Sequence, residues 1–343
     1  MPLPAPFDRF LLGPRADAFL LGPGATILVT VVLLSMQALG GQPAIAAGTA
    51  ALWLAWIFVG PHYAATYRRA YASLDVVRAH PWVTLAAPPV LLAGAFAALR
   101  DPGGFGLFYF AAYVVWAGYH YSGQSLGLAM LYPLRQGARL DPVEKRLIAA
   151  PLYLSWILSL VGLLRLSGKA RNPAYDFVRG AYAGPPLPAW VPPVGLGVLG
   201  ASLVCIAIVA RRRARRGVPL PWPTFAVLSA QLLWFAIGLY QPFLNIRLVP
   251  IFHSLQYLGF TSWHACRGQD AGRLRRLAWY ALPTLLLGLA IYPGSFNFFN
   301  RGLRYQEILV MSATVATFLN LHHFLLDGRV WRMRERPVVE SMM

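Results

Sequence analysis

Long apolar runs separated by short polar segments are the main pattern along the chain. Each run has about 20 residues, the length that an α-helix needs to cross the hydrocarbon core of a bilayer. Pro and Gly mark many of the ends, as in Gly60-Pro61 and Tyr292-Pro293. We expect ten spans, over residues 18–40, 43–66, 81–99, 105–132, 147–167, 190–210, 221–241, 244–265, 277–293 and 303–326.

The basic residues between these runs predict their orientation. If the N-terminus lies in the cytoplasm, most of the 30 Lys and Arg residues fall on the cytoplasmic side, including the RRRARR run at 211–216. This asymmetry agrees with the positive-inside rule. The sequence therefore predicts an all-α, polytopic transmembrane helical bundle of about ten spans with both termini cytoplasmic, in a bacterial-type inner (plasma) membrane.

The polar segments leave no room for a separate soluble domain, so we expect one transmembrane domain over residues 1–343. Within it we expect an interfacial N-terminal segment at 1–17, an outer loop at 168–189 and a basic cytoplasmic tail at 328–343.

Composition supports the membrane interpretation and offers a different explanation of the high net charge. The chain is 57% hydrophobic and 12% charged, and a soluble domain has about twice that charged fraction. A net charge of +18 suggests nucleic acid in a soluble protein. Here the charges lie in short loops, so we expect no nucleic-acid partner and instead expect anionic inner-leaflet lipids. Cys205 and Cys266 have no partner at a metal or disulfide spacing.

The histidines are concentrated in predicted spans that run inward. All except His80 lie in the second, fourth, eighth and tenth spans, in their predicted cytoplasmic halves, as His62, His120, His253, His264, His322 and His323. Ionisable side chains are costly inside a membrane and commonly mark functional sites. Each histidine alone is more readily explained as a hydrogen-bonded core or interfacial residue than as a ligand, so the metal interpretation depends on several of them meeting.

Imidazoles from separate helices form a suitable site for iron, copper or zinc. We predict that His62, His120 and His253 bind the metal with one of His322 and His323, which point about 100° apart on their helix. His264 lies about 16 Å along the helix from His253 and cannot share its ion. Supporting groups that orient ligands or substrate are expected about one turn from the ligands, at Gln124, Tyr257 and Asp327.

Other metal and catalytic motifs are missing from the sequence. Carboxylates are nearly absent from the spans, which argues against a bundle-type di-iron site. The HxxxH and HxxHH boxes of membrane desaturases and hydroxylases do not occur. No convincing hydrolase, P-loop or dinucleotide motif is present either.

The stretch around Pro61-His62 resembles the PHGxxDH-like motif of the bacterial Brp/Blh-like β-carotene dioxygenases. Tyr63 stands in place of the glycine, and Thr66 and Tyr67 stand in place of the Asp and His. His120, His253 and His322 correspond to the family's remaining ligands by position along the chain. The resemblance implies a membrane-embedded non-haem iron centre that acts with O₂ on an isoprenoid.

We therefore expect a histidine-ligated, membrane-embedded oxidoreductase, most simply a non-haem iron oxygenase or a desaturase-like enzyme, with a hydrophobic lipid or isoprenoid substrate. Aromatic residues beside His120 and His253 fit an apolar substrate and fit ordinary packing equally well. The alternative is a non-enzymatic membrane carrier or binder of lipid, quinone, haem or metal. Another transition metal or haem also stays open as the cofactor.

Overall fold

The computed structural model describes residues 10–164, 188–240, 242–267 and 272–331, together with Val338 and Glu340. These residues form helices and turns and no β-strand. The first half of the chain contains α1 (Pro14–Ala16), η2 (Asp17–Leu21), α2 (Gly24–Leu39), α3 (Gly41–Ala70), α4 (Leu74–Ala79), η3 (Trp82–Ala86), α5 (Ala87–Arg100), α6 (Phe105–Arg135) and α7 (Pro142–Leu164), where η denotes a π-helical turn. The second half contains α9 (Val191–Arg215), α10 (Trp222–Tyr240), α11 (Pro242–Cys266), α12 (Arg273–Leu289), η4 (Ala290–Gly294), α13 (Ser295–Phe299) and α14 (Tyr305–Val330).

A helix overlaps each of the ten predicted ranges, so the all-α helical bundle is confirmed. Fewer helices are both long enough and apolar enough to cross a membrane. Among the described residues, five are long and apolar enough, over Gly41–Ala70, Trp82–Arg100, Val191–Arg215, Leu274–Phe299 and Glu307–Val330. The bent pair Pro14–Leu21 and Gly24–Leu39, with 48° between its parts, would make a sixth. Ten spans and cytoplasmic termini stay predictions.

Three predicted polar segments fall largely outside the described residues. These are the first part of the interfacial segment 1–17, nearly all of the outer loop 168–189 and most of the basic tail 328–343.

The chain divides into two compact units, and each is described by itself. Unit 1 comprises Met1–Trp53, Tyr121–Leu163 and Leu187–Trp263, and unit 2 comprises Leu54–His120, Leu164–Pro186 and His264–Met343. Boundaries fall within α3, α6 and α11 and before the last residue of α7, so each of these helices contributes residues to both units.

Buried polar contacts connect the helices of unit 1. Asp17 of η2 accepts hydrogen bonds from the backbone N–H groups of Leu11 and Leu12, at 2.9 and 2.8 Å, and from the Tyr132 hydroxyl of α6 at 3.0 Å. The Trp234 indole of α10 donates to Thr26 of α2 at 2.7 Å. In an apolar interior such bonds hold helices at a defined register, because an unsatisfied polar group there is costly.

A buried ion pair fixes the end of α9 against the start of α7 in unit 1. Asp141 and Glu144 cap α7 reciprocally, since each side chain accepts a hydrogen bond from the backbone N–H of the other residue, at 2.8 and 3.1 Å. The Arg213 guanidinium donates to Glu144 at 2.9 Å and to the Ala138 carbonyl at 2.8 Å. Gly217, with φ of 72°, adopts the left-handed conformation that ends the helix.

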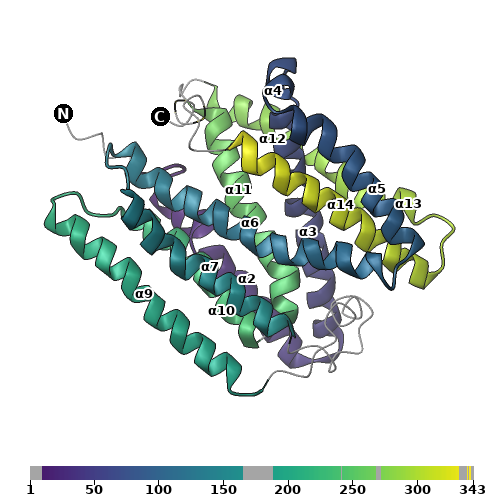
Figure 1. The fold of residues 1–343 in the computed structure, drawn as a ribbon, viewed down its shortest axis with the longest axis horizontal. Coiled ribbons are helices and arrows are strands. Elements are labelled where there is room, and N and C mark those ends of the chain that lie inside the picture. The colour runs from purple at the N-terminus through teal and green to yellow at the C-terminus, as the bar shows by residue number, and fades with distance from the viewer. Residues whose placement is uncertain are drawn as a thin grey trace. The chain divides into compact units, whose positions relative to one another are not determined.

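Unit 2 is built around α3 and α14. In Figure 1 the α5 helix lies alongside α14, and the two helices are in contact. Gly60 of α3 and Gly288 of α12 approach so closely that a Cβ atom on either glycine would meet backbone atoms of the other helix. Small residues allow this approach between apolar helices, and the contact lies within one turn of His62.

Candidate metal centre

The helices α3 and α14 run parallel and in register. Contacts join His62 to His323, Thr66 to Asp327 and Arg69 to the Val330 carbonyl, at 2.8, 2.8 and 3.2 Å, and each pair is separated by 261 residues. A constant separation means that a step along α3 is matched by an equal step in the same direction along α14. His62 and His323, which lie one turn before Thr66 and Asp327, are therefore at the same height along the two helices.

Three imidazoles converge in unit 2 from three helices. The Nε2 atoms of His62 and His323 lie 2.8 Å apart, and the ring of His120 lies with its centroid 5.0 Å from that of His323. One ring nitrogen from each of these histidines lies within 4.8 Å of the others. His62 and His323 are buried, and the His120 side chain is only 8% exposed. The predicted convergence of His62, His120 and His323 is therefore present in the structure.

Asp327 adds a carboxylate to the same three imidazoles. Its Oδ1 atom accepts a hydrogen bond from the Thr66 hydroxyl at 2.8 Å. Its Oδ2 atom faces His120 Nε2 and His323 Nε2, at 3.9 Å from each. Since Thr66 fixes one oxygen of the carboxylate, the other oxygen is directed toward the ring nitrogens.

His322 lies beside His323 in the sequence but faces away from this group. Its Nε2 atom lies 3.1 Å from the Val83 carbonyl and its Nδ1 atom 3.0 Å from the Tyr67 hydroxyl. Because a carbonyl only accepts, Nε2 carries the proton and donates it, and Nδ1 accepts from Tyr67. Both nitrogens are thus engaged in hydrogen bonds. Of the predicted pair, the group contains His323 and not His322, because the two side chains leave α14 about 100° apart.

The remaining predicted site residues belong to unit 1. His253 of α11 is buried, and its ring lies with its centroid 4.3 Å from that of Tyr121. Gln124 donates through Nε2 to the backbone carbonyl of His253 at 3.1 Å. Tyr257 is buried one turn along α11. The sequence predicted that Gln124 orients a ligand ring. In the structure its amide contacts the main chain of His253.

Aromatic rings surround the three imidazoles of unit 2. Phe324 stacks on His120 with 4.5 Å between the ring centroids, and Tyr113 and Trp116 contact Phe324 in turn. On another side, the Tyr63 ring lies 5.2 Å from that of His323. The Tyr63 hydroxyl donates to Asn320 at 2.9 Å. The group is therefore enclosed by apolar ring faces with few polar atoms.

The donor set fits a transition metal ion. Two atoms bound to one ion at about 2.1 Å can lie at most about 4.2 Å apart. The separation of 2.8 Å between His62 and His323 and those of 3.9 Å between Asp327 and the two rings fall within this limit. Imidazole nitrogen with one carboxylate oxygen is a donor set that iron, copper and zinc accept.

A haem between His62 and His323 does not fit. Axial nitrogens on opposite sides of a haem iron lie about 4 Å apart, with the macrocycle between them. The nitrogens of His62 and His323 are 2.8 Å apart, and Asp327 faces the same point. The geometry of this pair therefore does not support a haem with His62 and His323 as its two axial ligands.

Thr66 supports Asp327, and Tyr67 holds His322 outside the three-histidine group; the sequence assigned neither of these roles. In the sequence the two residues only marked departures from a family motif. The i, i+4 spacing of His62 to Thr66 matches that of His323 to Asp327, and it places a hydroxyl level with the carboxylate once the helices are in register. The sequence contains both spacings, but nothing in it shows that the two helices pair.

Comparison of the chain with family models, with curated proteins and with solved structures finds no match. The resemblance to the Brp/Blh-like dioxygenases, which rests on Pro61-His62 and on the order of the histidines, therefore stays an expectation.

Proposed function

We propose that the chain is a multi-pass membrane protein that binds one non-haem iron ion through His62, His120, His323 and Asp327, and that it oxidises a hydrophobic lipid or isoprenoid with O₂. The observation that carries this proposal is the convergence of three buried imidazoles and one carboxylate within unit 2. A resident iron ion would supply one-electron chemistry toward O₂.

The charge of the group supports a bound cation. A buried carboxylate is costly unless a positive charge or several donors compensate it. The rings of His120 and His323, which bind metals in their neutral form, face Oδ2 of Asp327. A divalent ion between them would carry the charge opposite to that of the carboxylate and would bind neutral ring nitrogens.

His253 is proposed as a further ligand, as the sequence predicts. Within unit 1, the ring of His253 contacts that of Tyr121 at 4.3 Å between centroids. Gln124, one turn further, holds the backbone of His253 at 3.1 Å. In this proposal Gln124 and Tyr257 position His253 and the substrate.

An apolar substrate is supported by the rings around the imidazoles. Phe324, Tyr63, Tyr113 and Trp116 make the surroundings of the imidazoles apolar, which suits an isoprenoid chain, and they limit the access of water to the metal ligands. With ten spans and both termini in the cytoplasm, the group would lie in the cytoplasmic half of a bacterial-type inner membrane.

The first experiment is metal analysis with an optical spectrum of the full chain purified in detergent. We expect about one iron per chain and no haem absorption band. His120→Ala should remove the iron, whereas His80→Ala, at the C-terminal cap of α4, should retain it. A chain that stays metal-free after anaerobic loading with Fe(II) contradicts the proposal.

The second experiment separates an enzyme from a carrier. The iron-loaded chain is incubated with a polyene isoprenoid, and O₂ consumption and the masses of the products are measured. An enzyme consumes O₂ and changes the mass of the substrate. A carrier binds the isoprenoid and returns it unchanged, which is the alternative outcome.

A further inference from the structure

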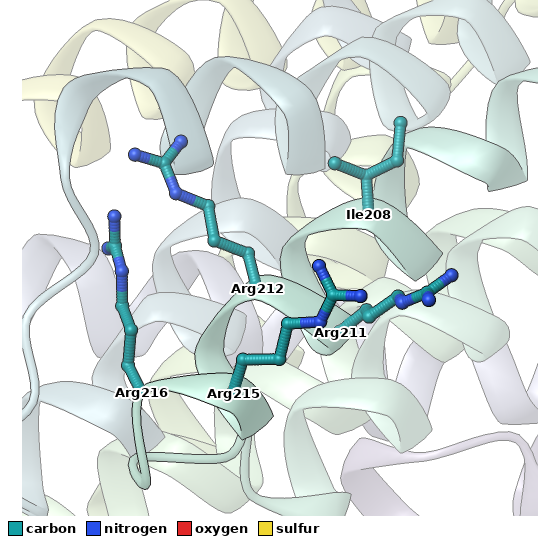
Figure 2. Close-up of a pocket in the computed structure, with 5 residues that line it drawn as sticks. All are labelled: Ile208, Arg211, Arg212, Arg215 and Arg216. Carbon is teal, nitrogen blue, oxygen red and sulfur yellow. The ribbon is translucent and has the colours of Figure 1, made fainter.

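The C-terminal end of α9 carries a cavity that is independent of the metal ligands. Its volume is about 550 Å³. Figure 2 shows the residues that line it, which are one apolar side chain and four arginines of the same helix end: Ile208, Arg211, Arg212, Arg215 and Arg216. Apart from Ile208, every side chain in this lining is cationic, so the charge of the lining favours an anion.

The arginines form two pairs, each spaced i, i+4. In Figure 2, Arg212 and Arg216 extend on one side of the helix end, and Arg211 and Arg215 lie together on the other. Like charges at this spacing repel each other on a helix surface. An anion bound between the members of a pair would relieve the repulsion.

Acidic residues compensate only one of the two pairs. Arg212 and Arg216 lie 3.8 and 3.6 Å from Asp141. Within the part of the chain that the structure describes, no carboxylate lies within ion-pair distance of Arg211 or Arg215. These two exposed arginines are therefore the cations available to a ligand.

The helix end is held firmly enough to present a defined site. Arg213, between the two pairs, is 3% exposed and donates to Glu144 at 2.9 Å and to the Ala138 carbonyl at 2.8 Å. This anchor turns Arg213, the third of the five arginines, inward and leaves the other four at the surface. The cationic cavity therefore depends on a buried ion pair behind it.

The position along α9 indicates the source of the anion. Val191–Arg215 is one of the helices long and apolar enough to cross a membrane, and the arginines occupy its last turn. Arginines at the end of a span lie at the depth of lipid headgroups. Ile208, one turn earlier, is the part of the lining that lies toward the apolar stretch of α9.

We propose that this cavity binds the phosphate-bearing headgroup of an anionic phospholipid, with Arg211 and Arg215 on the phosphate and Ile208 against the first part of an acyl chain. Arginine suits phosphate because its planar guanidinium can donate two parallel hydrogen bonds. The site goes beyond the proposed oxidation and does not depend on it, since none of its residues belongs to the metal centre.

Native mass spectrometry of the full chain in detergent tests the site. Titration with phosphatidylglycerol is compared with titration with phosphatidylcholine, and inorganic phosphate is added as a competitor. We expect wild type to prefer phosphatidylglycerol. The Arg211→Gln/Arg215→Gln variant should bind it about 30-fold more weakly, at roughly a factor of five for each arginine near an anionic surface.

The matched control is Arg78→Gln/Arg275→Gln, which removes the same charge from exposed positions elsewhere. It should change the affinity less than about twofold. Equal weakening in both variants would show attraction by net charge alone and overturn the site. Equal binding of phosphatidylcholine by wild type, or displacement of the lipid by inorganic phosphate at a similar concentration, would also overturn it, because the cavity would then not select an anionic lipid.

Discussion

Two buried carboxylates, Glu144 in unit 1 and Asp327 in unit 2, have different neighbours. Glu144 is 1% exposed and faces the Arg213 guanidinium at 2.9 Å, so the opposite charge comes from the protein itself. Asp327 is 8% exposed, accepts a hydrogen bond from Thr66, and faces two imidazoles at 3.9 Å. The first arrangement is complete as a structural ion pair. The second is an arrangement of metal-binding atoms, which is the physical basis for assigning function to it.

The largest effect that would sharpen this comparison comes from two adjacent residues of α14. His323→Ala removes a predicted ligand and should abolish iron retention, whereas His322→Ala should leave the iron content unchanged. The reason is that His322 uses both ring nitrogens for hydrogen bonds to Tyr67 and Val83. Iron is measured after gel filtration of the loaded chain. Loss of iron in the His322 variant alone would reverse the assignment.

The next effect concerns Glu144. Glu144→Gln leaves the buried Arg213 cation without its counter-ion and should destabilise unit 1 by about 3–5 kcal/mol, measured by denaturant unfolding in detergent. The iron content of the folded chain should not change. Asp75→Asn is the control, because it breaks the exposed Arg78–Asp75 pair and should cost less than about 1 kcal/mol. A Glu144 variant that folds normally but loses iron would contradict the assignment of Glu144 to a structural ion pair and of Asp327 to the metal.

Asp327→Asn should have a smaller effect on the metal than loss of a histidine. The amide keeps the shape and can still accept from Thr66, but it removes the negative charge beside the ring nitrogens. We expect iron affinity to fall by at least the roughly 10- to 100-fold found when groups next to metal ligands are replaced, because Asp327 is itself a proposed ligand. Competition with a chelator measures it. Unchanged affinity would show that Asp327 is structural in the same way as Glu144.

The smallest expected effect concerns Asp141, which caps α7 together with Glu144. Hydrogen bonds from the backbone N–H groups of Glu144 and Val143, with the nearby Arg212 and Arg216 charges, lower the pKa of Asp141. A lowered pKa in the folded state stabilises the fold above the ordinary carboxyl value of 3.8. That stabilisation is lost as the pH falls through the folded-state pKa.

Unfolding of wild type and Asp141→Asn is therefore compared between about pH 6 and about pH 3. Wild type should be the more stable at the upper end of the range, and the difference should shrink toward the lower end. A difference that grows as the pH falls would show that the pKa of Asp141 is raised in the folded state and not lowered.

The sequence predicted the helices well because bilayer-length apolar runs have few alternative structures. It was less informative about the height of each histidine along the bundle. Counted from predicted span ends, His120 lies deeper than His62 and His322, yet His120 lies beside His62 and His323. The helices do not end in one plane: His120 lies near the middle of α6, and His323 lies near the end of α14.

The choice between His322 and His323 also required the structure. Either histidine satisfies the sequence pattern, and only the rotation of α14 against α3 and η3 decides between them. Thr66 is informative for the same reason, because its role follows from the register of two helices that are distant in the sequence. Pairing between distant segments is set by packing of the whole unit, and a single sequence does not encode it in any local pattern.

X-ray absorption spectroscopy at the iron edge of the loaded chain tests the central claim most directly. A centre built from His62, His120, His323 and Asp327 predicts a first shell of nitrogen and oxygen at about 2.1 Å, with the outer-shell scattering of at least three imidazole rings. His323→Ala should remove that signal, and His322→Ala should preserve it. A shell dominated by sulfur, or one without imidazole scattering, would contradict the claim.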